Sequence, residues 1–425
     1  MHEFKRPQFL TLINRLKENP QHLNFVLGPR QVGKTTLVVQ VLKELTVPSL
    51  FVSVDEPDSV GTTSISDLEN LLPDWDSIPS YIHNQPRDES WIVRKWKEAR
   101  SLSRKSEKGF VLAIDEIQKI PNWSETIKGL WDADCRQKQQ FHVILLGSAP
   151  LLMQQGLSES LAGRIETIHL MHWSFSEMAE AFKFDIDQFI YYGGYPGGAN
   201  MITEEKRWGE YILNALIEPN IEKDILKMQR VDKPALLKKL FYLGTEYSGQ
   251  ILSYTKMLGQ LHDAGNTTTL ARYLDLLSKA GLLTGIEEYS SKPYKRKASS
   301  PKLNVLNTAL KSAGSEYSFN EAKADRSYWG RLVESAVGAH LLNSKNYRTQ
   351  IYYWRENNFE VDFVLKMGPK LIAIEVKSGT HKPNLSGLKQ FKDRFHPKGS
   401  FIVGEGGIPL SEFFMATGEE ILDME

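Results

Sequence analysis

The segment GPRQVGKTT, residues 28–36, has the residue types and the spacing of a loop that binds phosphate groups. It fits the pattern G-x-x-x-x-G-K-[ST], in which glycines allow a close backbone approach and backbone N–H groups point at the phosphates. Lys34 supplies positive charge for the β- and γ-phosphates of a nucleotide, and the hydroxyl of Thr35 can ligate Mg²⁺. The predicted nucleotide contacts are Gly28, Pro29, Arg30, Gln31, Val32, Gly33, Lys34, Thr35 and Thr36.

Two adjacent carboxylates follow an apolar run further along the chain. The run Phe110–Ile114 has the composition of a strand buried on both faces of a sheet, and Asp115 and Glu116 come directly after it. In open α/β sheets, this carboxyl end of the strand is the edge at which ligands bind. We expect Asp115 to hold Mg²⁺ through water, and Glu116 to orient and deprotonate the attacking water. An acidic loop alone would indicate little, but together with the phosphate loop it predicts nucleotide hydrolysis.

Two further residues are weaker candidates for the same site. A strand is predicted at residues 142–147, and Ser148 at its end could sense the γ-phosphate beside Glu116. A serine after a strand is also an ordinary helix cap. Arg164 could stabilise the transferred phosphate, in its own subunit or in a neighbouring one. An exposed arginine often has no such role, so the residue type alone leaves this open.

The flanking residues supply the elements that such a site needs. Leu23–Leu27 is predicted as a short apolar strand before the loop, and Leu37–Leu45 as a helix after it. Pro48–Val54 is predicted as a second strand, and residues 8–18 carry apolar residues at helical spacing. Because strand, loop and helix occur in this order, a chance match to the glycine pattern is a poor explanation of residues 28–36.

A helix near the C-terminal end of the chain carries the first residue of a second group. The helix is predicted at Trp329–Leu342, and Glu334 lies beside its apolar stripe. Gly330 and Gly338 stand four residues before and after Glu334. Two such small neighbours leave room for another element to approach this carboxylate.

A predicted hairpin carries the other members of this group. Residues 359–366 and 370–377 read as two strands joined at Gly368-Pro369. A two-residue loop places Asp362 directly opposite Glu375. Like charges facing each other across a ladder are destabilising, and a bound divalent cation would remove that cost.

The group therefore predicts a site for Mg²⁺ or Mn²⁺. Its predicted metal ligands are Glu334, Asp362 and Glu375, and Lys377 would lie beside the attacking water. The alternative is a polar hairpin face on which Glu360 forms an ion pair with Lys377.

The middle of the chain is predicted to be helical. Helices are expected at 204–228, 233–247 and 253–261, and Asn266 can cap another that ends before Gly281. With a strand at Leu282–Tyr289, this is the order of a winged helix. A basic stretch follows and could reach DNA phosphates as the wing; it comprises Lys292, Lys295, Arg296, Lys297 and Lys302. The alternative is a helical domain for protein contacts, with a solvated basic loop.

The chain resembles a prokaryotic branch of the AAA+ ATPases. The resemblance rests on GPRQVGKTT, the strand ending in Asp115-Glu116, LLGSAPLLMQQGLSESLAGR, LMHWSFSEM and YYGGYPG, with a departure at His172-Trp173, where relatives usually have proline. It favours a role for Arg164. It implies an α/β protein with an AAA-like P-loop NTPase core at 1–190, a helical winged-helix domain at 191–300 and a restriction-endonuclease-like domain at 301–425. The carboxylate group and Lys377 likewise resemble the PD-(D/E)XK nuclease motif.

Composition limits the possible environment and partners. The formal net charge is zero, so no field of the whole chain attracts it to nucleic acid or membrane. The single cysteine, Cys135, excludes an internal disulfide and fits a reducing cytoplasm. No apolar run approaches the ~20 residues that a spanning helix needs, so we expect no membrane association.

These observations predict an ATPase that uses ATP and Mg²⁺ and acts on nucleic acid, with DNA as the partner. We expect a cytoplasmic homo-oligomer, and a metal-dependent nuclease reaction as a second activity. The alternative function is a nucleotide-controlled switch or scaffold that binds a protein partner and whose nuclease fold is inert.

Overall fold

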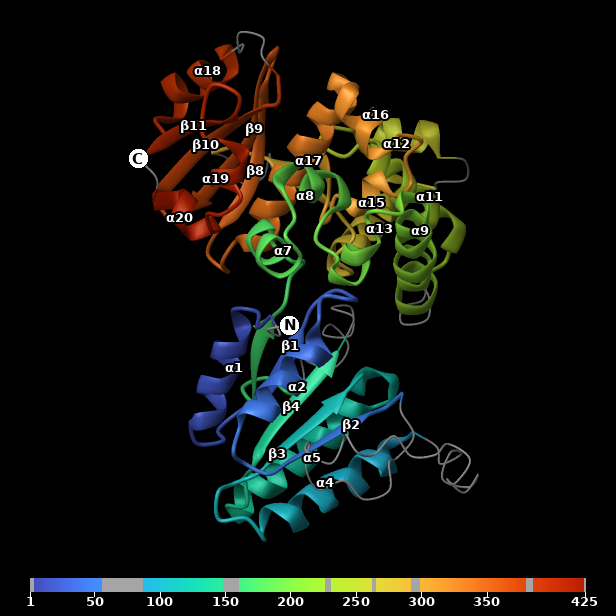
Figure 1. The fold of residues 1–425 in the computed structure, drawn as a ribbon, viewed down its shortest axis with the longest axis vertical. Helices are drawn as coiled ribbons and strands as arrows, with labels where there is room; N and C mark the ends of the chain where they lie inside the picture. Colours follow the sequence, from blue (N-terminus) through green and yellow to red (C-terminus); the bar gives the residue numbers. More distant parts are fainter. Residues whose placement is uncertain are drawn as a thin grey trace. The chain divides into compact units, whose positions relative to one another are not determined.

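A computed structural model of the chain describes residues 4–55, 87–147, 160–225, 231–261, 265–291, 299–379 and 385–423 (Figure 1). It divides into two compact units, Met1–Leu170 and Met171–Glu425, and each is considered by itself. Within the described residues, no helix combines the length and the apolar character needed to cross a membrane.

The first unit is built on a five-stranded parallel sheet of order β2-β3-β4-β1-β5. The strands are β1 (Leu23–Leu27), β2 (Ser49–Ser53), β3 (Val111–Asp115), β4 (His142–Gly147) and β5 (Ile165–His169). Its helices are α1 (Gln8–Lys17), α2 (Lys34–Glu44), α4 (Glu89–Ser103) and α5 (Trp123–Gln137), with a 3₁₀ turn at Ile117–Lys119. The strands predicted before and after the phosphate loop are confirmed, and α2 begins three residues earlier than predicted, so Lys34 and Thr35 lie in its first turn.

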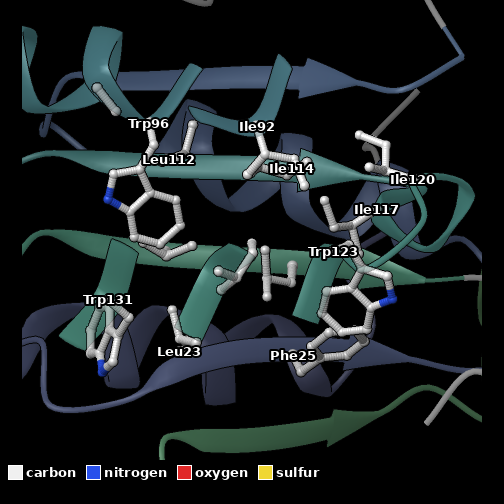
Figure 2. Close-up of a cluster of buried hydrophobic side chains, with 14 of the residues drawn as sticks. Leu23, Phe25, Ile92, Trp96, Leu112, Ile114, Ile117, Ile120, Trp123 and Trp131 are labelled. Atoms are coloured by element: carbon white, nitrogen blue, oxygen red, sulfur yellow. The ribbon is translucent and has the colours of Figure 1, made fainter. Parts of the chain in front are cut away.

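Helices cover both faces of this sheet, which explains why its strands are apolar throughout. Successive residues of a strand point to opposite faces. In β3, Leu112 and Ile114 pack with the tryptophans of α4 and α5 (Figure 2), whereas Val111 and Ala113 pack with apolar residues of α1 and α2. The prediction of a strand buried on both faces is confirmed. Since apolar contacts fix the strand on both sides, the residues at its carboxyl end have little freedom to move.

The second unit contains a six-stranded mixed sheet of order β11-β10-β9-β8-β6-β7. Its strands are β6 (Leu283–Glu288), β7 (Lys302–Val305), β8 (Gln350–Glu356), β9 (Phe359–Met367), β10 (Lys370–Lys377) and β11 (Gly399–Gly404). The pairs β10–β11 and β6–β8 are parallel, and the other neighbours are antiparallel. In the hairpin, Met367 pairs with Lys370 and Phe363 with Ile374, which is the register predicted from the two-residue loop.

Helices make up most of the rest of this unit. They are α7 (Phe175–Phe182), α8 (Ile186–Tyr192), α9 (Glu205–Glu210), α11 (Pro234–Glu246), α12 (Tyr254–Gln260), α13 (Thr267–Lys279), α15 (Ala309–Ser312), α16 (Phe319–Ala324), α17 (Arg326–Ser344), α18 (Ser386–Phe395), α19 (Leu410–Phe413) and α20 (Gly418–Asp423), with a 3₁₀ segment at Pro196–Met201. The stretch after α9 is π-helical at Tyr211–Ile217 and Asn220–Ile225, where one continuous helix was predicted. The predicted cap of α13 is present, because the Asn266 side chain accepts a hydrogen bond from the Thr269 N–H.

One feature of the second sheet differs from the expected domain plan. The division expected between residues 300 and 301 falls between β6 and β7, which are hydrogen-bonded neighbours. Strand β6 also pairs in parallel with β8 at Glu287 and Glu288. The strand predicted at Leu282–Tyr289 and Lys302, the last residue of the basic stretch predicted as the wing, are therefore parts of the same sheet as β9 and β10. The side chains of β7 contact the elements that carry the second carboxylate group.

Candidate functional site

The loop between β1 and α2 depends on glycine at two positions. Gly33 has a φ of 87°, in the left-handed region that glycine adopts without strain. At Gly28, an added Cβ would lie 1.9 Å from the carbonyl oxygen of Leu170. The loop therefore passes directly against the chain that leaves β5, since the Leu170 N–H donates to the Leu27 carbonyl oxygen at 2.7 Å. Gln31 is also left-handed, with a φ of 60°.

The first turn of α2 places a cation and a hydroxyl beside this loop. The Nζ of Lys34 donates to the carbonyl oxygens of Gly28 at 3.1 Å and of Pro29 at 2.8 Å, so the ammonium lies within the loop itself. The Oγ1 of Thr35 donates to Oδ2 of Asp115 at 2.6 Å. This hydrogen bond joins residues 80 positions apart in the chain and brings the end of β3 to the start of α2.

The two acidic residues after β3 are held in different ways. Asp115 is buried, and its second oxygen, Oδ1, accepts from the Glu116 N–H at 2.8 Å. Glu116 has a φ of 55°, a left-handed conformation that costs roughly 1–3 kcal/mol for a residue other than glycine and is concentrated at functional sites. Its Oε2 accepts from Gln118 Nε2 at 2.8 Å and lies 3.5 Å from Lys119 Nζ. The turn thus directs the Glu116 carboxylate toward two specific partners.

Sequence reasoning missed Gln118. This buried side chain also lies against the end of β4, because a Cβ added at Gly147 would be 3.0 Å from Gln118 Oε1. The sequence signal that could have indicated it is its position, because a polar residue two places after Glu116 is close enough to contact that carboxylate. Ser148, which follows Gly147, lies outside the described residues.

The chemistry of this set fits a nucleotide with Mg²⁺. The start of an 11-residue helix offers backbone N–H groups, and Lys34 offers a positive charge next to them. Thr35 and Asp115 offer a hydroxyl and a carboxylate within hydrogen-bonding distance of each other. Mg²⁺ bound with a nucleotide takes only a few oxygen ligands of this kind from the protein, because the phosphates supply other ligands.

The structure does not bring Arg164 to this site within one chain. The Leu23 N–H donates to the Arg164 carbonyl oxygen at 2.8 Å, so Arg164 lies at the amino end of β1, whereas the phosphate loop follows its carboxyl end. A five-residue strand separates them by about 16 Å. The guanidinium is bidentate with Asp132 of α5, Nε to Oδ1 at 2.7 Å and Nη2 to Oδ2 at 3.0 Å, and this hydrogen bonding lowers the pKa of Asp132.

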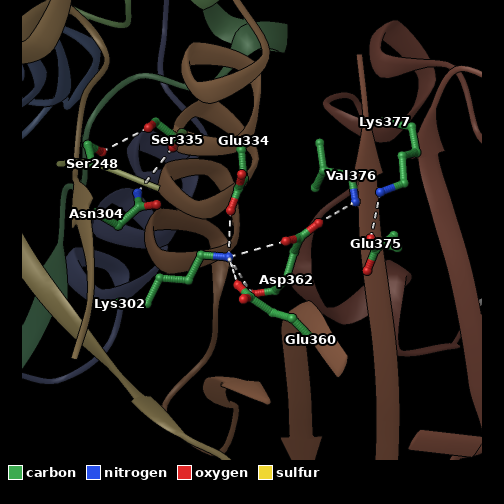
Figure 3. A network of polar contacts seen from close by, with 10 residues as sticks. All are labelled: Ser248, Lys302, Asn304, Glu334, Ser335, Glu360, Asp362, Glu375, Val376 and Lys377. Carbon is green, nitrogen blue, oxygen red and sulfur yellow. Dashed lines mark hydrogen bonds and ion pairs between the residues drawn. The ribbon is translucent and has the colours of Figure 1, made fainter. Parts of the chain in front are cut away.

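The second carboxylate group does converge, as the sequence predicted. Glu334 comes from α17, Asp362 from β9 and Glu375 from β10 (Figure 3). Lys377 Nζ donates to Oε1 of Glu375 at 2.6 Å, and Asp362 Oδ2 accepts from the Val376 N–H at 2.8 Å. The alternative ion pair, between Glu360 and Lys377, is replaced by this contact within β10.

Lys302 lies among these carboxylates, and its predicted place in a DNA-binding wing is wrong. Its side chain has no exposed surface, and its Nζ is 2.5 Å from Glu334 Oε1, 3.3 Å from Asp362 Oδ1 and 3.7 Å from Glu360 Oε1. The other basic residues of the predicted wing, Lys292, Lys295, Arg296 and Lys297, lie outside the described residues. Nothing in the sequence near Lys302 marks it as buried, because its partners are 32 or more residues away in the chain.

The predicted metal ligands do not form a metal-binding arrangement. In the part of the chain that the structure describes, no three His, Cys, Asp or Glu side chains are placed to hold a metal ion. The physical reason is Lys302, whose ammonium already supplies a positive charge to Glu334 and Asp362. Burial raises the pKa of Glu334 to about 7, and burial with the nearby Asp362 raises that of Glu375 to about 7.

Comparison with known proteins gives three family matches in succession. Residues 20–179 match an AAA domain, and residues 183–318 and 329–413 each match a domain of unknown function. Uncharacterized proteins of Mycobacterium tuberculosis and Mycobacterium bovis are each 24% identical over 367 residues, covering 84% of this chain and 70% of theirs. Among solved structures, a Walker-type ATPase of Pyrococcus abyssi matches with a TM-score of 0.50 and 18% identity, over 73% of this chain and 95% of that one.

The family match and the sheet topology agree on the first unit. The match to an AAA domain covers the phosphate loop, both acidic residues and all five parallel strands. The Pyrococcus abyssi structure supports the same fold. The chain is therefore an α/β protein with a parallel-sheet, P-loop NTPase-like core, and that core is similar to AAA domains.

Proposed function

We propose that this protein binds ATP at residues 28–36 and hydrolyses it. The observation that carries the proposal is the 2.6 Å hydrogen bond between Thr35 and Asp115, formed beside the ammonium of Lys34. Mg²⁺ bound at this pair would neutralise the charge that develops on the transferred phosphate. The match to an AAA domain supports the same reaction class.

Each residue of the site has a distinct task in this proposal. The ammonium of Lys34 is held by two backbone carbonyl oxygens, and phosphate oxygens can replace these as partners without a change in the backbone. Glu116 acts as the general base, and Gln118 and Lys119 keep its carboxylate oriented. The left-handed conformation of Glu116 turns its side chain away from the direction of β3. The carboxylate of Asp115, the last residue of β3, accepts the hydrogen bond from Thr35.

Substitutions should separate binding from turnover. Lys34→Ala should abolish detectable ATP binding, because it removes the ammonium that lies against the loop carbonyl oxygens of Gly28 and Pro29. Glu116→Gln should retain ATP binding and lose roughly 10²–10⁴-fold in turnover, because it removes only the base. Titration with a fluorescent ATP analogue and a phosphate-release assay measure the two effects.

The matched control for this experiment is Lys43→Ala, an exposed lysine at the other end of α2. It should leave binding and turnover at the level of the unsubstituted protein. If Lys34→Ala binds and hydrolyses ATP as well as Lys43→Ala does, the proposed site is wrong.

We further propose that Arg164 contributes to the site of a neighbouring copy, so that the working form is a homo-oligomer. Arg164 is about 16 Å from the phosphate loop of its own chain, and its ion pair with Asp132 is partly exposed. A guanidinium binds a carboxylate and a phosphate with the same two-pronged geometry, so a phosphate of a neighbouring copy can take the place of Asp132.

A mixing experiment tests this role. Arg164→Ala alone should lower turnover by roughly 10³-fold or more, as is usual for arginines that contact transferred phosphate. Mixing Arg164→Ala with Glu116→Gln should restore part of the activity, because each variant supplies the group that the other lacks. Arg136→Ala, an exposed arginine of α5, is the control and should change nothing. Mixed oligomers that stay inactive would contradict a contribution in trans.

DNA is the partner that we propose for the second unit. The support is the order α11, α12, α13 and then the hairpin β6–β7, which is the order expected of a winged helix, together with the basic residues at 292–297. The structure removes Lys302 from that basic set. If ATP hydrolysis is indifferent to DNA, the second candidate function, a nucleotide-controlled switch or scaffold for a protein partner, is favoured instead.

Charge reversal tests the DNA proposal. Replacing Lys295, Arg296 and Lys297 with glutamate should weaken binding to duplex DNA and flatten the dependence of log K on log salt by about 0.9 per lost phosphate contact. The control reverses Lys105 and Lys108, which are exposed in the first unit. ATP hydrolysis is measured in parallel with duplex, single-stranded and branched DNA. A salt dependence equal to that of the control would contradict this placement of the DNA surface.

A further inference from the structure

A buried ammonium lies among the carboxylates of Glu334, Glu360 and Asp362 in the second unit (Figure 3). The side chain of Lys302 has no exposed surface and enters the group from β7. We propose that Lys302 is a resident cation that takes the place of the divalent metal implied by the likeness to nucleases, so that this group binds no such metal and cleaves no nucleic acid. The inference concerns the second unit alone and does not depend on ATP hydrolysis.

The surroundings of the ammonium match what a lysine can donate. A lysine ammonium has three N–H donors and no acceptor. Lys302 Nζ lies 2.5 Å from Glu334 Oε1 and 3.3 Å from both Oδ1 and the backbone oxygen of Asp362. Glu360 Oε1 lies 3.7 Å away and is the fourth oxygen atom near the ammonium. These are oxygen ligands from three side chains and one carbonyl, a set of the kind that a hard cation would otherwise take.

Asp362 is the residue for which a metal and Lys302 would compete. Its Oδ1 faces Lys302, and its Oδ2 accepts from the Val376 N–H at 2.8 Å. Both oxygens are therefore engaged, whereas a metal shared with Glu375 would need one of them. Two positive charges about 4 Å apart repel strongly in a buried site, so the ammonium would have to leave before a metal could enter.

Hydrogen bonds to neighbouring elements hold β7 in place, and so keep Lys302 among the carboxylates. Asn304 lies on the same face of the strand, and its Nδ2 donates to the Ser335 carbonyl oxygen of α17 at 3.1 Å. Ser248 Oγ is 2.8 Å from Ser335 Oγ and accepts from the Val305 N–H at 3.1 Å. Gly338 permits this contact, because a Cβ there would be 2.3 Å from Asn304 Oδ1. The room that Gly338 leaves is thus occupied by β7, whereas Gly330 faces Ser378 Oγ.

Two ammonium groups, of Lys302 and Lys377, supply positive charge to these carboxylates without a metal. Burial alone would lower the pKa of Lys302, but the carboxylates of Glu334, Asp362 and Glu360 raise it above its usual value, so the ammonium stays charged. Glu375 Oε2 is buried and has no hydrogen-bond partner among the described residues. The other oxygen of this carboxylate, Oε1, accepts a hydrogen bond from Lys377 Nζ at 2.6 Å, so Glu375 has a cation beside it without a metal.

Removal of the lysine should create the metal site that the carboxylates otherwise resemble. The experiment titrates the full-length chain with Mn²⁺ in the absence of nucleotide and measures free Mn²⁺ by electron paramagnetic resonance. All proteins carry Asp115→Asn, which removes the candidate ligand of the first unit. The four compared are this background alone and the background with Asp362→Asn, with Lys302→Met, and with both.

The background and its Asp362→Asn form should bind the same amount of Mn²⁺. Lys302→Met should bind one additional Mn²⁺ per chain, and the added Asp362→Asn should abolish it. If the background protein binds Mn²⁺ and Asp362→Asn abolishes that binding, the proposal is overturned. A folded Lys302→Met protein that binds no more Mn²⁺ than the background would also overturn it.

Lys302→Met leaves buried carboxylates without a cation and can therefore prevent folding. A second variant, which adds neutralising changes, covers that case. In that case Mn²⁺ should restore the cooperative thermal unfolding of Lys302→Met, as should the neutralising changes Glu334→Gln and Asp362→Asn. Restoration by those neutralising changes but not by Mn²⁺ would contradict a metal-like role for Lys302. A cleavage assay with linear and branched DNA in Mn²⁺ is the last test. If the unsubstituted protein cleaves DNA and Asp362→Ala does not, the proposal is also overturned.

Discussion

The hydrogen bond between Thr35 and Asp115 is the contact on which the nucleotide site depends. In the first sheet, β4 lies between β1 and β3, so the loop after β1 and the carboxylate after β3 start two strand spacings apart, about 9.6 Å. The hydrogen bond from Thr35, in the first turn of α2, to Asp115 joins these two ends. Parallel strands, buried on both faces, fix the two ends that the hydrogen bond joins. Lys34, Glu116 and Gln118 are positioned relative to these same ends.

The sequence allowed much of the first unit to be predicted, because its signals are local. The run Leu23–Leu27, the glycine pattern after it and the carboxylates after Phe110–Ile114 each lie within a few residues of the element that they define. The register of the hairpin, in which Phe363 pairs with Ile374, was predictable for a similar reason, since a two-residue turn sets it. In these cases the chain needs no distant partner to specify the geometry.

The residues whose positions the sequence did not indicate depend on contacts between distant parts of the chain. Lys302 meets Asp362 across 60 residues, and only because β6 pairs in parallel with β8 and carries β7 into the same sheet. The partner of Arg164, Asp132, lies on a helix 32 residues earlier, and Arg164 lies at the amino end of β1, away from the phosphate loop at its carboxyl end. A list of basic residues cannot distinguish a lysine that faces DNA from one that neutralises buried carboxylates. The two sites of the chain accordingly use lysine in different ways, since Lys34 is held by carbonyl oxygens and Lys302 by carboxylates.

The central claim is that Thr35 and Asp115 act together on one bound cation, and a double-mutant cycle tests it most directly. The quantity to measure is kcat/KM for ATP hydrolysis in saturating Mg²⁺, for the unsubstituted protein, Thr35→Val, Asp115→Asn and the double variant. If the two groups serve the same ion, the double variant should lose no more activity than the more damaging single change, because the second substitution removes an interaction already lost. Losses that multiply in the double variant would mean that the two residues act independently, and would contradict this account of the site.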